Sequence, residues 1–253
     1  MAEIVDSPGV VLVVSFVGLL LAALLGVASQ KFWSLVKTGD QDEFNIVQAA
    51  ALTLLGLIVG FSFAMAISRY DLRKTLEEAE ANAIGTEYAR ADLMPESAGA
   101  VTRGVLKRYL NQRILFYETA DQSRLEQISA ETAKLEADLW TSARSVAAMQ
   151  PTPVTALVVS GMNDVLNSAD FTRAAWLNRI PRAAWWLMIM IGVACNLTLG
   201  LGARRFNTFL LLVVPLTVSV SFFLIADIDS PRGGLIRVLP QNLLRLASSL
   251  HAR

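Results

Sequence analysis

Two aspartates stand where the last apolar stretch of the chain ends. In FFLIADIDSPRGG, Asp227 and Asp229 follow the apolar run and precede a Pro-Arg-Gly-Gly segment, 231–234. Carboxylates at the mouth of a membrane helix could hold a cation, but Ca²⁺ takes about six to eight oxygen ligands and Arg232 would compete with it. The pair is therefore a weak metal candidate, and we predict no metal and no other cofactor. We expect instead a helix exit at which the proline and the glycines turn the chain.

A second apolar run, 46–68, carries two stripes of side chains at helical spacing. Leu57, Phe61 and Met65 recur at every fourth residue, and rings of apolar side chains can gate a pore by dewetting. The adjacent stripe consists of small residues, which let helices approach closely: Gly56, Gly60, Ala64 and Ser68. Two interpretations remain open. The small residues pack helices within one subunit, or they pack subunits together around a constriction formed by the larger stripe.

Arg69 and Arg73 continue the face of Phe61 beyond this run at the same spacing. If the helix lines a conduit, the two guanidinium groups would give it a positive cytoplasmic mouth that attracts small anions. The same two arginines would also anchor the cytoplasmic end of a membrane helix, which requires no pore.

Most enzymatic chemistry lacks its residues in this chain. There is one cysteine, Cys195, and one histidine, His251, so a disulfide within the chain and a cysteine-based metal site are excluded. The sequence contains no phosphate-binding glycine loop, no HExxH and no CxxC motif. We therefore predict that the protein is not an enzyme. Basic and acidic residues balance at 22 each, so the net charge gives no reason to expect a nucleic-acid partner.

Four apolar runs are long enough to cross a lipid bilayer, which takes about 20 residues. They cover 9–28, 46–68, 183–202 and 208–226. The chain is 54% hydrophobic and 17% charged, whereas soluble domains are about 25% charged. No lysine or arginine precedes the first run, which favours a membrane span over a cleaved signal peptide. The lipid bilayer is therefore the first expected partner.

Four spans place both termini and the segment between the second and third spans on one side of the membrane. Arginines flank the spans mainly on that side, although Arg204 and Arg205 run against the trend. The positive-inside rule then predicts that this side is the cytoplasm. We expect four parts: transmembrane pairs in 1–68 and 183–226, a cytoplasmic helical domain in 69–182 and a cytoplasmic tail in 227–253.

The middle segment has the pattern of a helical bundle. A first helix continues from the second span to Pro95, and two more are predicted at about 97–118 and 122–149. Thr152 followed by Pro153 is typical of a further helix start. We find no alternation of useful length for a strand, so the whole protein should be all-α.

Narrow apolar seams are predicted on the first and third of these helices. They consist of Leu72, Leu76, Ala79, Ala83 and Thr86 on the first, and of Leu125, Ile128, Thr132, Leu135 and Leu139 on the third. Ser123 with Glu126 could form a capping box for the third helix. The charged residues of the bundle are expected on solvated faces.

Three segments of the chain resemble the bacterial bestrophin-like membrane protein family. They are GFSFAMAISRYDLRKTLEEAEANAIGTEYARADLMP (60–95), LNSADFTRAAWLNRIP (166–181) and DIDSPRGGLIRVLPQNLLRL (227–246). The resemblance covers about 45–250 and implies a distant analogy to bestrophins, which are pentameric anion channels with four spans and a cytosolic helical part. It also implies that the second span lines a pore with an apolar neck. Calcium-gated bestrophins carry a dense acidic cluster after the fourth span, and that cluster is missing here.

Two functional hypotheses remain. The first is a channel-like homo-oligomer in the bacterial inner membrane, a pentamer by analogy, that conducts small anions. Leu57, Phe61 and Met65 would form its constriction, and Arg69 and Arg73 its cytoplasmic mouth. The alternative is a membrane-anchored scaffold or signalling protein whose helical domain binds a cytosolic partner through a face such as Leu125 to Leu139.

Overall fold

The computed structural model describes residues 7–34, 41–202 and 208–251, and every regular element in these residues is a helix. The chain divides into two compact units. The first, which we call the membrane unit, comprises Met1–Arg69 and Arg179–Arg237. The second, the helical unit, comprises Tyr70–Asn178 and Val238–Arg253. The C-terminal segment 227–253, expected as one tail, is shared between them.

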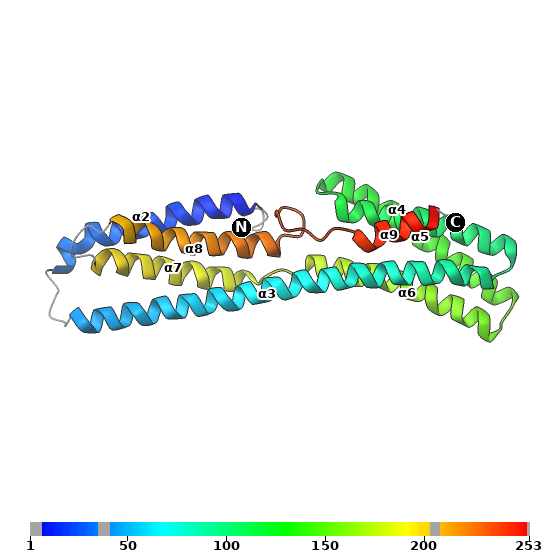
Figure 1. The fold of residues 1–253 in the computed structure, drawn as a ribbon, viewed down its shortest axis with the longest axis horizontal. Coiled ribbons are helices and arrows are strands. Elements are labelled where there is room, and N and C mark those ends of the chain that lie inside the picture. The colour runs from blue at the N-terminus through cyan, green and yellow to red at the C-terminus, as the bar shows by residue number, and fades with distance from the viewer. Residues whose placement is uncertain (1–6, 35–40, 203–207, 252–253) are drawn as a thin grey trace. The chain divides into compact units, whose positions relative to one another are not determined.

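The membrane unit is built from long apolar helices that run in roughly the same direction in Figure 1. They are α2 (Pro8–Ser34), the first part of α3 (Gln41–Arg90), α7 (Arg182–Gly202) and α8 (Thr208–Asp229). Four helices in the described residues are long and apolar enough to cross a membrane. The predicted all-α fold with four membrane-spanning helices is thus confirmed.

A close helix contact in the membrane unit involves glycines outside the predicted stripe. A Cβ atom on Gly200 of α7 would lie 2.0 Å from the carbonyl oxygen of Ala23 and 2.9 Å from the Cα of Gly26, both on α2. No L side chain fits there, so the two backbones meet directly. The side chain of Gln30 adds a hydrogen bond of 2.7 Å from Nε2 to the carbonyl oxygen of Gly200. Small residues do allow close packing in this unit, but on α2 and α7.

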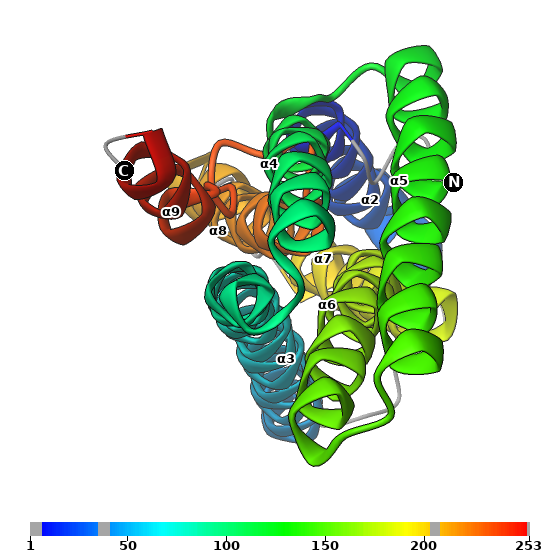
Figure 2. The same ribbon diagram turned by 90° about the vertical axis from the view of Figure 1, so that its right-hand side faces the viewer.

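The helical unit is formed by the second part of α3, the short 3₁₀ helix η1 (Ala91–Leu93), α4 (Glu96–Glu118), α5 (Gln122–Met149), α6 (Pro153–Leu177) and α9 (Gln241–His251). Helix α4 packs against both α5 and α9, as seen in Figure 2. The predicted helices at 97–118 and 122–149 are confirmed to within a residue. Helix α9 has no counterpart in the sequence-based prediction, although Leu243 and Leu250 of its apolar face are buried.

Helix starts in the helical unit follow their local sequence. Thr152 caps α6 through a capping box with Thr155, and Pro153 opens the helix, as predicted. The predicted capping box of α5 is wrong. Asp121 is the N-cap, and its carboxylate accepts hydrogen bonds from the backbone N–H groups of Ser123 and Arg124. A charged carboxylate at this position satisfies two free donors and suits the positive end of the helix.

The third-helix seam predicted from the sequence lies in the core. All five seam residues of α5 are buried, and their apolar members pack in one cluster with residues of α4 and α6. The seam predicted on α3 is wrong, because Leu72, Ala79 and Thr86 are exposed. The buried face of this part of α3 instead carries four charged residues together with Ala81 and Ile84. These four are Arg73, Glu77, Glu80 and Glu87.

Candidate functional site

The predicted pore-lining stripe lies on an outward face of α3. Leu57 is 52% exposed and Phe61 66% exposed, and Met65 is half-buried. The opposite side of the helix is turned inward, where Leu55, Ser62 and Ala66 are buried. The described residues of a single chain therefore leave the larger part of the stripe exposed.

The small-residue stripe of α3 lies on the exposed side as well. Gly56, Gly60, Ala64 and Ser68 are all exposed, and no atom would lie within 4 Å of a Cβ atom built on Gly56 or Gly60. Among the described residues nothing packs against Gly56 or Gly60, so the structure gives no support to the interpretation that this stripe packs helices within one subunit. Packing between subunits stays a prediction.

Arg69 is engaged in an ion pair at the end of the membrane unit. Its Nη1 lies 3.5 Å from Oδ1 of Asp229, and the arginine side chain is 15% exposed. The expected positive mouth is therefore partly neutralised at this residue. The pair joins α3 to the last residue of α8. Arg69 therefore contributes to the packing of these two helices, and this role does not require a pore.

Arg73 differs from the predicted mouth residue because its side chain is buried in the helical unit. Nε donates to the carbonyl oxygen of Ala175 and Nη2 donates to that of Asn178, each at 3.3 Å. These carbonyls belong to the end of α6, where a helix leaves acceptors unpaired and carries partial negative charge. In this structure the Arg73 guanidinium stabilises the end of a neighbouring helix.

Asp227 holds the chain that follows α8. Its carboxylate accepts hydrogen bonds from the backbone N–H of Leu235 at 2.6 Å and of Ile236 at 2.9 Å. Gly234 makes this possible, because a Cβ atom there would lie 2.3 Å from the carbonyl oxygen of Asp227. The chain therefore turns after α8 and comes back to the level of Asp227.

Asp229 holds the start of the third span. Both carboxylate oxygens accept from the backbone N–H of Ile180, at 3.2 and 3.1 Å, just before α7 begins. Asp227 and Asp229 are both buried, and backbone donors already occupy the oxygens that a cation would need. Among the described residues no three His, Cys, Asp or Glu side chains are grouped closely enough to hold a metal ion. The weak metal candidates are better explained as two structural carboxylates.

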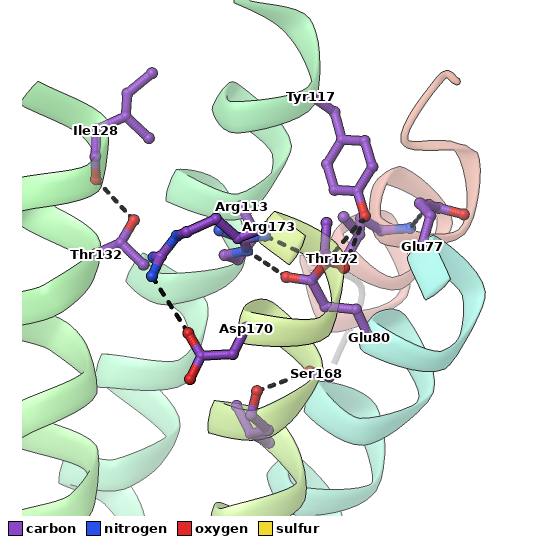
Figure 3. A network of polar contacts seen from close by, with 12 residues as sticks. Glu77, Glu80, Arg113, Tyr117, Ile128, Thr132, Ser168, Asp170, Thr172 and Arg173 are labelled. Atoms are coloured by element: carbon purple, nitrogen blue, oxygen red, sulfur yellow. Dashed lines mark hydrogen bonds and ion pairs between the residues drawn. The ribbon is translucent and has the colours of Figure 1, made fainter. Parts of the chain in front are cut away.

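The helical unit contains a buried polar network around Glu80 of α3 (Figure 3). The Arg113 guanidinium donates to the Glu80 carboxylate through Nε and, at 3.4 Å, through Nη2. The hydroxyl groups of Tyr117 and Thr172 also donate to Glu80 Oε2, each at 3.1 Å. Burial lowers the pKa of Arg113, but the charge and hydrogen bond of Glu80 outweigh it and hold that pKa above its ordinary value. One carboxylate thus ties α3, α4 and α6 together.

Two other glutamates occupy the same buried face of α3. Glu77 caps α9, where its Oε1 accepts from the backbone N–H of Asn242 at 2.8 Å and of Leu243 at 3.0 Å. Glu87 has no hydrogen bond to either carboxylate oxygen and lies against Gly161 of α6. Burial raises the pKa of Glu87 to about 8, although Arg90 acts to lower it. The expectation that the charges of the bundle are solvated is wrong for this face.

A spacing signal in the sequence could have revealed this face. Glu77, Glu80, Ile84 and Glu87 are separated by three, four and three residues, which puts them on one side of a helix. A search for helical stripes of apolar residues misses this face, because such a search assumes that acidic residues face the solvent.

Comparison with known proteins identifies the family to which this architecture belongs. The model of the bestrophin-like domain matches residues 22–243. The chain belongs to the bestrophin-like family. None of the curated proteins matches the chain in sequence.

Several solved structures share its fold. A bacterial bestrophin homologue from Klebsiella pneumoniae is similar with a TM-score of 0.63 at 14% identity, covering 93% of this chain and 98% of that one. A variant of that homologue gives a TM-score of 0.66 at 11% identity, over 96% and 99% of the two chains. A chain described as a membrane protein gives 0.62 at 12% identity, over 93% and 98%. This bestrophin-like chain is thus an integral membrane protein with a channel-like architecture.

Proposed function

We propose that this bestrophin-like protein is a homo-oligomeric channel that conducts small anions through a pore lined by the first part of α3. The observation that carries the proposal is the uncovered face of α3. Phe61 and Leu57 stand outward beside Gly56 and Gly60, which no other described residue covers. In a ring of subunits the small stripe would receive the neighbouring helix, and the larger stripe would face the axis as an apolar constriction.

The proposed cytoplasmic mouth retains Arg69 and not Arg73. Arg69 is partly exposed but paired with Asp229, so its field on a passing anion is weaker than that of a free guanidinium. The proposal includes an inner-membrane location with both termini and the helical unit on the cytoplasmic side, which rests on the distribution of arginines around the spans. A pentamer is proposed by analogy with bestrophins.

The scaffold alternative required an accessible binding face on α5, and the structure does not provide one there. The face from Leu125 to Leu139 is buried in the core of the helical unit, and a partner could reach it only by unfolding the bundle. No other contact of the described residues favours that function.

Flux through reconstituted vesicles tests the constriction. Phe61→Ala should raise chloride efflux severalfold. The phenyl rings of the wild type would narrow the pore and oppose its wetting, and the substitution would widen it. Phe209→Ala is the matched control, since Phe209 is a 70% exposed phenylalanine of α8, and it should leave efflux unchanged. Equal efflux from wild type and both variants, with all three intact, would contradict a constriction at Phe61.

Particle size provides an independent test. Purified protein in mild detergent should contain several copies in a ring, and images of it should show α3 nearest the axis. A monomer or a dimer would contradict the channel proposal without any measurement of flux.

A further inference from the structure

The most exposed large apolar side chain among the described residues lies just after the fourth span. Leu235 is 86% exposed, and the next residue, Ile236, is 41% exposed. They belong to residues 230–237, which we call the return loop. Exposed apolar side chains held in water are unfavourable in proportion to their area, so this pair needs an explanation.

The return loop is a built structure and not a loose connection. The Asp227 carboxylate binds the backbone N–H groups of Leu235 and Ile236, and the hydroxyl of Ser230 accepts from the N–H of Gly233 at 3.2 Å. These bonds use backbone groups, so they fix the loop without engaging the Leu235 and Ile236 side chains, which are exposed. The loop therefore presents the pair in a defined place.

That place lies at the end of the fourth span, where the apolar run stops. Asp227 directly follows the apolar run of α8, which ends at Ala226, and the return loop comes back to its level. Asp229 at the end of α8 binds the N–H of Ile180 just before α7, so α7 enters the membrane beside the place where α8 leaves it. The second turn of α7 carries Trp186, which is 52% exposed, and tryptophan is typical of the interfacial belt.

The charges on the loop match a headgroup layer. Arg237 is exposed, and its Nε donates to the carbonyl oxygen of Gly234 at 2.7 Å, which holds the side chain beside the apolar pair. Arg182, at the start of α7, is also exposed. The two carboxylates nearby are buried and occupied by donors. The exposed charge at this boundary is thus positive and complementary to anionic lipid.

We propose that the return loop is an interfacial membrane anchor, in which Leu235 and Ile236 enter the acyl boundary and Arg237 binds the headgroup of an anionic lipid. This goes beyond conduction, because it holds for the membrane unit whether or not the protein contains a pore. The anchor would fix the depth of the α8 exit and, through Asp229, the depth at which α7 enters.

Site-specific quenching tests the depth of the loop. The full chain carries Cys195→Ala and one new cysteine, labelled with bimane and reconstituted in phosphatidylcholine nanodiscs with and without phosphatidylglycerol. Leu235→Cys is the probe, Val17→Cys of α2 marks the lipid-facing surface and Phe171→Cys of α6 marks the helical unit, each replacing an exposed apolar residue. Lipid-borne nitroxides near the headgroup should quench position 235 at least as strongly as position 17, and far more than position 171.

Two outcomes would overturn the anchor. Quenching at 235 equal to that at 171 would place the loop in water. Protection of 235 from both lipid nitroxides and aqueous iodide would show that protein, such as a second copy of the chain, covers it. The loop is held by backbone hydrogen bonds, so Leu235→Cys should leave the thermal midpoint of unfolding unchanged. A lowered midpoint would identify a misfolded variant.

Lipid charge tests the arginine. A nitroxide on phosphatidylglycerol should be enriched at position 235 by about fivefold over one on phosphatidylcholine, the effect of one cation near an anionic surface. Arg237→Gln should remove this enrichment and leave the depth of the probe unchanged. Equal enrichment with and without Arg237 would overturn its role as the headgroup contact.

Discussion

The membrane unit and the helical unit use opposite kinds of groups at their tightest contacts. In the membrane unit, α2 and α7 meet backbone to backbone at Gly26 and Gly200. In the helical unit, the interior between α3, α4 and α6 holds the charged pair Glu80 and Arg113. The membrane unit thus relies on direct backbone contact, whereas the helical unit encloses a charged pair within an apolar core.

The difference follows from the solvent around each unit. Lipid is as apolar as a leucine side chain, so membrane helices gain little from burying apolar groups and depend on close van der Waals contact between small residues. The helical unit has a core of leucine, isoleucine and aromatic side chains, and removal of these from water gives a large favourable free energy. That free energy offsets the desolvation of an ion pair whose hydrogen bonds are satisfied.

Removal of one partner from the buried pair should have the largest effect. Glu80→Ala leaves the Arg113 guanidinium buried without its carboxylate, and we expect a loss of about 3–5 kcal/mol in unfolding free energy. Chemical denaturation of the purified protein in detergent, followed by circular dichroism, measures this. The control is Asp170→Ala, which removes an exposed ion pair with Arg173 on α6 and should cost roughly 0.5 kcal/mol or less.

Equal losses from the two substitutions would contradict the comparison, because they would show that Glu80 is as well solvated as Asp170. Glu80→Gln should fall between them, since the amide keeps hydrogen bonds to the network but carries no charge.

A methyl group at the glycine crossing should have the next largest effect. Gly200→Ala places a Cβ atom 2.0 Å from the carbonyl oxygen of Ala23, so α2 and α7 must separate, with an expected loss of about 3 kcal/mol. The matched control is Gly18→Ala on α2, where nothing lies within 4 Å. That substitution should stabilise the helix by up to about 1 kcal/mol.

The thermal midpoint of each variant in detergent measures the difference. If Gly200→Ala and Gly18→Ala behave alike, close backbone contact does not hold the membrane unit together, and the contrast between the two units fails on the membrane side.

The smallest of the three effects should come from Glu87 and should depend on pH. Its pKa is raised from 4.5 to about 8 by burial, so the folded state keeps a proton that the unfolded state releases above pH 4.5. Stability from this group is therefore greatest in acid, falls as the pH rises through the interval between the two values, and is constant above it. We expect a total loss on the order of 2 kcal/mol, less than the full shift would give, because water drawn toward the charged carboxylate would offset part of its desolvation.

Unfolding curves at a series of pH values for wild type and Glu87→Gln check this prediction. The glutamine cannot titrate, so the variant should lack this part of the decline. The groups that act on Glu87 are Arg90 on its own helix and Asp164 on α6, and Asp164→Asn serves as the control that lowers the pKa without removing the acid. Identical pH profiles for wild type and Glu87→Gln would contradict a buried, protonated Glu87.

The sequence was most informative where a pattern is local. Apolar runs of sufficient length identified the spans, and Thr152 with Pro153 identified the start of α6, because span length and capping depend on neighbouring residues only. Helix α9 escaped notice because a helix of eleven residues is too short to be stable without tertiary contacts. In the fold it packs against α4 and is capped by Glu77. The N-cap of α5 is Asp121 and not the predicted Ser123. Several neighbouring polar residues are suitable N-caps, and the sequence alone does not show at which of them the helix begins.

At the candidate site, too, the sequence showed local patterns but not tertiary contacts. The outward stripe of Leu57, Phe61 and Met65 was visible from spacing, but nothing in the spacing distinguished an uncovered face from a packed one. Arg69 and Arg73 were equivalent by spacing, yet one pairs with the end of α8 and the other with the end of α6. Partners so distant along the chain have no signature in the residues around either arginine.

By itself, the sequence determined that the protein is all-α and that four of its segments suit a membrane. These properties are sums over consecutive residues, such as transfer free energy, helix period and capping. Only the tertiary structure decided which charged groups are buried, because burial is decided by helices that are remote in sequence. Asp227 and Asp229 illustrate this: as sequence they form an acidic pair at a helix end, and in the fold they are separate acceptors that secure the return loop and the start of α7.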